Sequence, residues 1–323
     1  SYIYFSLHLD SHYADLALGE NEFDTPVLSQ QTIEPINNKP CKTITGVKPV
    51  NNLTSHTGNT CWFFGKRNSE MSPPLDVASI RREEKTEVEE DDKLSLLTWN
   101  IDGLDGEEQP QRARGLCSYI LEYSPDVVLL QEMVQPYIRF MHKRLATNYT
   151  FIEGGEIGYF TTMLLKKTRV TLLDSKILPF RYSRMMRNLL IAQVMFRGQK
   201  VCLMTSHFES CKDNSGERMR QFNAVIKRMT VFGISATSVI CDLWEQLGEP
   251  EKCRYTWDTW ANTNKEMRFK NRLRFDRVYL RRAVKDGVPR MEPHSMALVG
   301  LERLKCGRYT SDHWGIYCTF SFE

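Results

Sequence analysis

Short apolar segments that end in polar residues constrain this 323-residue chain more than any other feature. One such segment, residues 94–98, runs into Asn100 and Asp102, and the next, residues 126–130, runs into Glu132. Apolar runs of this length between turn signals are typical of buried strands. In α/β folds, polar side chains just beyond the strand ends form the functional site. The pattern therefore predicts a layered α/β domain whose site gathers side chains from several strand ends.

The same reading predicts a series of strands with helices between them. The predicted strands are residues 94–98, 126–130, 149–153, 159–165, 170–173, 189–196, 201–205, 237–241, 276–280 and 314–320. The predicted helices, from apolar residues at helical spacing, are residues 111–123, 136–145 and 215–232. Several strands alternate apolar and polar residues, which favours mixed sheets over purely parallel ones.

The first 92 residues have a different composition. They carry a net charge of −7, whereas the remainder carries +10, and residues 83–92 hold seven acidic side chains. Prolines and polar residues are frequent in between, which is typical of disorder. We therefore predict that residues 1–92 are a disordered acidic linker or the remnant of an N-terminal module, and that residues 93–323 form the folded domain. The basic charge of that domain indicates an anionic partner.

Other classes of protein are not favoured by the sequence. No stretch approaches the ~20 apolar residues of a membrane span, and no charged-then-apolar signal pattern begins the chain. Nine cysteines lack any C-x-x-C pair, so neither a disulfide framework nor a zinc site is predicted. These features predict a soluble protein of a reducing compartment, the cytosol or the nucleus, with no membrane partner.

Six polar residues near the predicted strand ends suit phosphoryl transfer. They are Asn100, Asp102, Glu132, His207, Asp312 and His313. A hard metal such as Mg²⁺ takes one or two carboxylates with substrate phosphate and water, and Asp102 and Glu132 can supply the carboxylates. The two histidines can donate hydrogen bonds to phosphate oxygens as charge develops on them. Taken singly, a histidine at a strand end is more often structural, and Asp312 either orients His313 or points elsewhere from a turn.

Four short sequence motifs resemble those of the endonuclease/exonuclease/phosphatase superfamily and occur in the same order. They are Thr98-Trp99-Asn100, Leu130-Gln131-Glu132, Ser206-His207-x-Glu209-Ser210 and Ser311-Asp312-His313. The resemblance spans nearly all of residues 94–323. Longer strings narrow it to the 5′-tyrosyl-DNA phosphodiesterase branch. These strings are residues 97–105, 158–161, 185–190, 203–207, 255–259, 273–277, 306–308 and 311–315.

The resemblance implies a fold and a reaction. The fold is a four-layer α/β sandwich, DNase I-like, in which two mixed β-sheets are flanked by helices. The reaction is hydrolysis of the phosphodiester between a protein tyrosine and a DNA 5′ end, which leaves a 5′-phosphate and repairs trapped topoisomerase complexes. The implied cofactor is Mg²⁺, for which Mn²⁺ can substitute, and the implied location is the nucleus with a cytoplasmic pool. Protein partners are expected through the N-terminal region.

The resemblance also implies roles for individual residues. Asp102 and Glu132 match the metal side of the site, and the residues that match the phosphate side are Asn100, His207 and His313. The remaining residues match positions at which the family contacts DNA ends, preferably single-stranded ones. They are Tyr159, Arg187, Ser206, Ser210, Trp257 and Phe275. Aromatic side chains can stack on splayed bases, although for Phe275 a core position is about equally expected from the sequence.

One motif of the resembled family is missing. The family carries G-D-x-N after a buried strand and before an Asp-x-Trp-Glu segment, which Asp242 opens here, and its Asp activates the attacking water. The chain passes from the predicted helix 215–232 to Asp242 without that motif. The chain is thus a splice form or faulty gene model, an inactive relative that binds DNA ends, or an enzyme in which Asp242 replaces the base. We predict weak or no activity, because a lost general base typically costs ~10²–10⁴-fold.

Rival functions remain within and outside the superfamily. Abasic-site endonucleases, deadenylases and lipid phosphodiesterases share the core strings, but the segments around Trp257 and Phe275 argue against them. A non-catalytic DNA-end-binding or scaffold protein would keep the basic surface and the aromatic residues while needing no metal. Dependence on Mg²⁺ separates that alternative from the enzyme.

Overall fold

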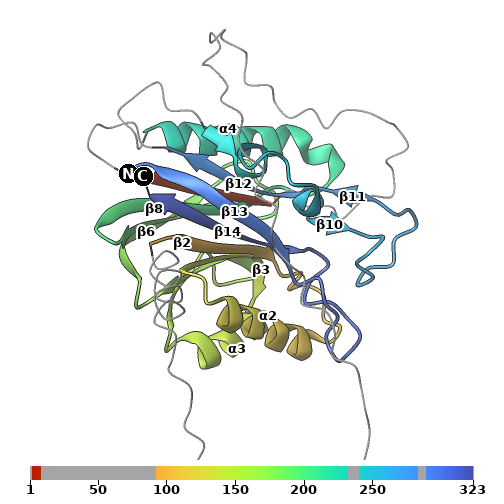
Figure 1. The fold of residues 1–323 in the computed structure, drawn as a ribbon. Helices are drawn as coiled ribbons and strands as arrows, with labels where there is room; N and C mark the ends of the chain where they lie inside the picture. Colours follow the sequence, from red (N-terminus) through yellow and green to blue (C-terminus); the bar gives the residue numbers. More distant parts are fainter. Residues whose placement is uncertain (1, 9–91, 232–239, 283–288, 323) are drawn as a thin grey trace, which may run out of the picture. The chain divides into compact units, whose positions relative to one another are not determined.

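The computed structural model describes residues 2–8, 92–231, 240–282 and 289–322, of which β1, Thr230 and Val231 are described by their backbone alone. These residues form one compact unit built around two six-stranded sheets (Figure 1). The prediction for residues 9–91 lies outside the described residues. Among the described residues, no helix combines the length and apolarity that a membrane crossing requires.

The first sheet has the strand order β6-β7-β8-β1-β12-β9. Its strands are β1 (Tyr2–His8), β6 (Val170–Pro179), β7 (Asn188–Phe196), β8 (Gln199–His207), β9 (Ile240–Asp242) and β12 (Asp276–Arg281). All pairs are antiparallel except β1 with β8, which run parallel.

The second sheet has the strand order β13-β14-β2-β3-β5-β4. Its strands are β2 (Leu94–Asn100), β3 (Val127–Val134), β4 (Tyr149–Glu153), β5 (Tyr159–Lys166), β13 (Met291–Val299) and β14 (Gly315–Phe322). Only β2 and β3 run parallel in this sheet. The prediction of mixed sheets is therefore confirmed.

Helices cover the outer faces of both sheets. They are α2 (Gln109–Tyr123), α3 (Gln135–Leu145), α4 (Ser215–Val231) and the single turn α5 (Leu243–Gln246). Apolar side chains of α2 and α3 pack with outward-facing residues of the second sheet, and those of α4 pack on the first sheet. A separate pair of short strands, β10 (Trp257–Asp258) and β11 (Arg272–Leu273), lies beside the sandwich. The predicted four-layer fold is confirmed.

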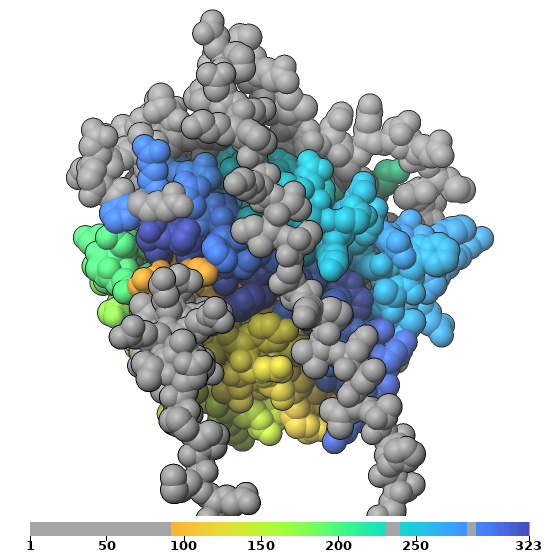
Figure 2. Space-filling view, viewed as in Figure 1, coloured from red at the N-terminus to blue at the C-terminus, as the bar shows by residue number. Residues whose placement is uncertain are grey.

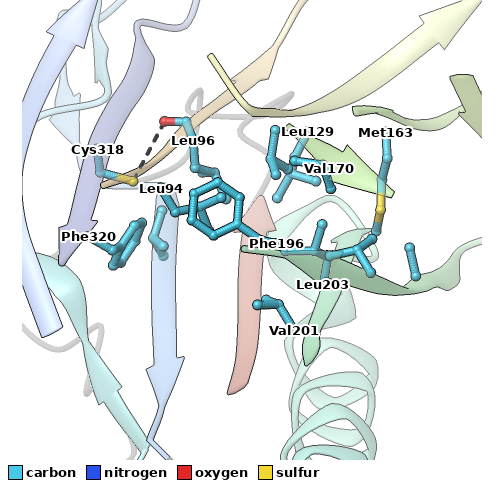
Figure 3. Packing of buried hydrophobic residues seen from close by; sticks show 14 of the residues in the cluster. Leu94, Leu96, Leu129, Met163, Val170, Phe196, Val201, Leu203, Cys318 and Phe320 are labelled. Carbon is cyan, nitrogen blue, oxygen red and sulfur yellow. Dashed lines mark hydrogen bonds between the residues drawn. The ribbon is translucent and has the colours of Figure 1, made fainter. Parts of the chain in front are cut away.

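The central core lies between the sheets. Leu96 and Leu129 of the second sheet pack with Phe196 and Leu203 of the first, all of them fully buried (Figure 3). Fully burying a side chain of this kind stabilises the fold by about 1.5–3 kcal/mol. One polar side chain crosses this layer, since Gln131 Nε2 donates to the hydroxyl of Thr205 in the first sheet at 3.1 Å.

Besides the short pair β10 and β11, two strands of the large sheets were not predicted. Tyr2–His8 forms the seven-residue strand β1 at the centre of the first sheet, so assigning all of residues 1–92 to a linker or remnant was wrong for this segment. β13 was not predicted, because it contains Pro293, which cannot donate to a strand ladder. The structure places β13 at the edge of the second sheet, with a register shift between Pro293 and Ser295.

Candidate active site

Strand ends from both sheets meet at one edge of the sandwich. Asn100 ends β2 and Glu132 lies near the end of β3, whereas His207 ends β8 of the other sheet. His207 Nε2 lies 3.8 Å from Glu132 Oε1. The segment before β14 joins them, since Ser311 Oγ donates to the carbonyl of Asn100 at 2.6 Å. The predicted phosphate-side and metal-side residues are thus brought together.

Asn100 connects the carboxylate of Glu132 to the backbone of Asp102. Its Nδ2 donates to Glu132 Oε1 at 2.9 Å, and its Oδ1 accepts from the backbone N–H of Asp102 at 2.9 Å. All three residues are buried. The amide thus holds the side chain of Glu132 in a fixed relation to the backbone of Asp102.

The backbone at both carboxylates is strained. Asp102 has φ 49° and Glu132 has φ 58°, in the left-handed region that side chains other than glycine seldom adopt. Gly103 packs so closely on this loop that a Cβ there would collide with the carbonyl oxygen of Glu132. Strained residues persist only where the surroundings enforce them, and they cluster at functional sites.

Arg112, which the sequence reading missed, fixes the loop that carries Asp102. It is fully buried on α2, and its Nη2 donates to the carbonyls of Ile101 and Asp102, each at 2.8 Å. Its Nε donates to the carbonyl of Thr310 at 3.1 Å. On the surface of the molecule, the yellow region that includes α2 adjoins blue residues of the C-terminal part (Figure 2). No strand-end pattern points to Arg112, because it contributes from the first turn of a helix.

Lys265 was also missed, and it supplies positive charge to the carboxylates. Its Nζ lies 3.0 Å from Asp102 Oδ2 and 3.0 Å from Asp105 Oδ2. Burial, followed by the charge of Asp312, nevertheless raises the pKa of Asp102 to about 7, against the lowering effect of Lys265 and Arg112. The two cations therefore do not offset the effects of burial and of Asp312 on the pKa of the Asp102 carboxyl.

These residues fit a divalent cation. Asp102 and Glu132 are buried and joined through Asn100, and a cation would relieve the effect of burial and charge repulsion on Asp102. In the part of the chain that the structure describes, no three His, Cys, Asp or Glu side chains gather as a ready metal cage. A cation held here would thus take one or two carboxylates and complete its shell with phosphate and water oxygens.

Arg187 holds His207 in one tautomer. Its Nη1 lies 2.8 Å from His207 Nδ1, and its Nη2 donates to Ser210 Oγ at 2.7 Å. A guanidinium offers only donors, so Nδ1 must accept and the proton of a neutral His207 sits on Nε2. Nε2 faces Glu132, so the N–H of His207 is directed into the site. Arg187 and Ser210 thus orient His207 in this structure, and their predicted DNA contacts stay predictions.

Two further side chains after β8 have structural partners. Ser206 Oγ donates to the carbonyl of Asn188 at 2.7 Å, which ties β8 to β7 at the site. Glu209 accepts from Ser183 Oγ at 2.7 Å and from the backbone N–H of Arg184 at 2.8 Å. Glu209 thereby anchors the loop that delivers Arg187, a role that its place in the Ser-His-x-Glu-Ser string did not reveal.

His313 is oriented by Asp276 and not by its neighbour Asp312. His313 Nδ1 lies 2.9 Å from Asp276 Oδ2, and both side chains are buried. Burial alone would lower the pKa of His313, but Asp276, Asp312 and Glu132 outweigh it and raise the pKa to about 10. His313 is therefore an imidazolium at neutral pH. Asp312 instead accepts from Trp257 Nε1 at 3.3 Å, which agrees with the alternative in which Asp312 points elsewhere.

The predicted aromatic contacts divide into two groups. Tyr159 is half-buried, with its ring 5.8 Å from that of His207 and the Arg187 guanidinium 4.6 Å from its centroid. Trp257 is only 2% exposed and packs 5.5 Å from Phe275, whose ring lies 6.2 Å from His313. Tyr159 thus has surface to offer a base, whereas Trp257 can offer little more than an edge.

Asp242 is committed to other partners. Its Oδ1 accepts from the backbone N–H of Trp244 at 2.9 Å, which caps α5. Its Oδ2 lies 2.7 Å from Arg274 Nη1 and 3.4 Å from Arg277 Nη1. Both oxygens serve the structure, so the interpretation of Asp242 as a replacement base finds no support in this geometry.

Comparisons with known proteins find a matching family model, similar sequences and similar structures. Residues 97–202 match the model of the Endonuclease/Exonuclease/phosphatase family. Tyrosyl-DNA phosphodiesterase 2 of Danio rerio is 50% identical over 260 residues, 73% of this chain and 69% of that protein. The human protein of the same name is 44% identical over 263 residues, 75% and 72% of the two chains. The crystal structure of D. rerio TDP2 complexed with single-strand DNA product covers 71% of this chain and 99% of its own, with 50% identity and a TM-score of 0.66.

Proposed function

Because the chain belongs to the tyrosyl-DNA phosphodiesterase 2 family, we propose that it hydrolyses the phosphodiester between a protein tyrosine and a DNA 5′ end. The products are a 5′-phosphorylated DNA end and a free tyrosyl peptide, as repair of trapped topoisomerase–DNA complexes requires. The observation that carries the proposal is the meeting of Asn100, Glu132, His207 and His313 at one edge of the sandwich. A relative solved with a single-strand DNA product supports the substrate class.

The phosphate would lie between the donors of the site. The Nε2–H of His207 and the imidazolium of His313 are positioned by Arg187 and Asp276 to donate to its oxygens. Asn100, held by Glu132 and Asp102, keeps the carboxylate and phosphate sides together. Tyr159 is the best placed of the predicted aromatic side chains to stack on a base beside the reacting end.

The proposed cofactor is Mg²⁺, with Mn²⁺ able to replace it. Glu132 and Asp102 would hold the cation, which would compete with the ammonium of Lys265 for Asp102 Oδ2. When bound, the cation supplies Lewis-acid stabilisation of charge on the phosphate and on the departing tyrosyl oxygen. The residues of the chain align the phosphate, because they place two buried carboxylates beside two histidines that donate hydrogen bonds to it.

This chain would hydrolyse the phosphodiester slowly for a member of its family. The chain has no recognisable G-D-x-N motif, and Asp242 is engaged by two arginines and the start of α5. Water activation without a dedicated base typically costs ~10²–10⁴-fold. The same observation favours one second candidate function, a catalytically inactive DNA-end-binding or scaffold relative.

A panel of substrates tests the proposed function. Oligonucleotides carrying 5′-phosphotyrosine, 3′-phosphotyrosine or an internal abasic site are incubated with the chain in Mg²⁺, Mn²⁺ or EDTA. We expect cleavage of the 5′-tyrosyl strand alone, a 5′-phosphate product by mass spectrometry, and no reaction in EDTA. Tight binding of 5′-tyrosyl DNA without cleavage in either metal would support the scaffold alternative, and preferred cleavage of another substrate would refute the proposal.

Location and partners complete the proposal. DNA 5′ ends with tyrosyl adducts arise where topoisomerases act on DNA, so we place the protein in the nucleus with a cytoplasmic pool. Protein partners would bind through the N-terminal region. Fractionation of cells that express the chain, with and without a topoisomerase poison, checks the location.

A further inference from the structure

The centre of the first sheet is filled from the N-terminal end of the chain. β1 pairs with β8 in parallel along seven residues, from Tyr2↔Val201 to His8↔His207. On its other side it pairs with β12 in antiparallel orientation along six residues, from Ile3↔Arg281 to His8↔Asp276. Figure 1 shows β1 in red between strands from the second half of the chain. Without β1, the sheet separates into β6-β7-β8 and β12-β9.

Among the residues that the structure describes, β1 is the strand that lies between β8 and β12. Eight residues, 232–239, separate the end of α4 at Val231 from the start of β9 at Ile240, and β9 pairs with the far side of β12. In the family that the chain resembles, a buried strand followed by G-D-x-N is expected between these two elements. That strand is missing from the sequence, and residues 2–8 occupy the sheet instead.

The segment suits a central strand. Its sequence, YIYFSLH, is rich in aromatic and β-branched residues and contains no proline, glycine, lysine or acidic residue. The backbone groups of β8 and β12 that face it would otherwise form two strand edges in the middle of a packed sheet, and unpaired edges are unfavourable. Residues 9–93 connect β1 to β2, so the segment is held by one long connection.

The register places β1 beside both histidines of the site. His8 lies opposite His207, which ends β8, and opposite Asp276, which begins β12 and orients His313. We propose that residues 2–8 are a complementing strand, which enters a strand-acceptor groove between β8 and β12 and thereby sets the spacing of His207 and the Asp276–His313 pair. The occupant is the chain's own N-terminal segment, and its binding controls the assembly of the histidine side of the site.

Hydrogen exchange of the full chain tests the strand itself. Phe5→Pro removes a backbone donor from the middle of β1, and Asn37→Pro, between β1 and β2, is the matched control. In Phe5→Pro we expect exchange of residues 199–207 and 276–281 to accelerate at least tenfold, with residues 94–100 and 127–134 unchanged. Equal protection in Phe5→Pro and the control would overturn the proposal.

A second experiment, in which the connection between β1 and β2 is made cleavable, tests the proposal even if Phe5→Pro does not fold. A site-specific protease sequence inserted between Asn37 and Asn38 of the full chain lets the connection be cut after folding. The N-terminal piece should then co-elute with the domain, and excess synthetic peptide of residues 1–9 should displace it. Release of the piece with no change in Tm or exchange would refute the proposal, as would a dimer before cutting that exchanges the strand between copies. These measurements do not require enzymatic activity, so the strand proposal can fail while the proposed function stands. Only the expected effect of β1 on catalysis rests on the proposed function.

Discussion

The two sides of the site are built in different ways. The carboxylate side rests on the second sheet, where β2 and β3 lie close in sequence and run parallel, and Asn100 joins Asp102 to Glu132 within one network. The histidine side rests on the first sheet, and its two histidines depend on partners brought from elsewhere, Arg187 for one and Asp276 for the other.

This difference indicates which side of the site depends on the N-terminal strand β1 and which side does not. The carboxylate side is fixed by the amide of Asn100, between two neighbouring strands of one sheet, and by the buried Arg112. The histidine side needs β8 and β12 to be held at the right spacing, and the strand between them comes from the other end of the chain. A change in the pairing of β1 with β8 and β12 should therefore affect the histidine side of the site before the carboxylate side.

Breaking the Asp276–His313 pair should have the largest effect. Asp276→Asn leaves a buried imidazolium without its carboxylate, and breaking a buried pair typically costs roughly 3–5 kcal/mol. At ~2–4 °C per kcal/mol for a domain of this size, Tm at pH 7 should fall by more than about 6 °C. Carboxylate-side protection in hydrogen exchange should change little below the new Tm. Asp258→Asn, at a half-buried pair with exposed Arg272, is the control.

The same pair gives the sign of a pH dependence. His313 has its pKa raised to about 10 in the folded chain, above the ordinary value of 6.5 expected in the unfolded chain. Its contribution to stability is therefore complete below about pH 6.5 and is lost as pH rises through about 10. The Tm difference between wild type and Asp276→Asn should shrink from pH 6.5 to pH 10.5. A difference that grows with pH would show that His313 is neutral in the fold.

Gly103→Ala should disturb the carboxylate side by a smaller amount. The new Cβ meets the carbonyl oxygen of Glu132, and overpacking of this kind costs typically 1–3 kcal/mol. Gly106→Ala is the matched control, because its Cβ would meet nothing within 4 Å. Urea unfolding should separate the two variants. Equal stability would mean that the left-handed Glu132 can relax without loss.

Lys265→Met should have the smallest effect on stability and a specific effect on cation binding. The variant removes an ammonium 3.0 Å from Asp102 Oδ2, so a divalent cation no longer competes with it there. We expect Mn²⁺, measured by calorimetry and by electron paramagnetic resonance, to bind roughly tenfold more tightly, about 1.4 kcal/mol. Lys270→Met, exposed on the same segment, is the control and should leave the affinity unchanged. Weaker binding in Lys265→Met would place Lys265 among the residues that help to hold the cation.

Much of this architecture was predictable from local patterns. Apolar runs identified β2, β3, β7 and β8, and the polar residues after them included Asn100, Glu132 and His207. Those predictions succeed because burial on both faces produces a continuous apolar run whose end is marked by polarity.

The parts that escaped prediction depend on pairing over long separations. Asp276 meets His313 across 37 positions, and Lys265 meets Asp105 across 160 positions from an irregular segment without periodicity. β1 resembles a strand locally, but its place in the sheet follows from an opening that only the folded chain reveals. Nothing in the immediate neighbourhood of these residues encodes their partners.

Turnover of a 5′-phosphotyrosyl single-stranded oligonucleotide in Mg²⁺, by the full chain beside its Glu132→Gln variant, tests the central claim most directly. Glu132→Gln keeps the size of a side chain that accepts from Asn100 but removes the charge that would hold the cation. We predict slow release of tyrosine from the wild-type chain, and a loss of at least about 10²-fold in the variant, with DNA binding retained in both. Equal turnover by the two proteins, or DNA binding without any turnover by wild type, would contradict the account.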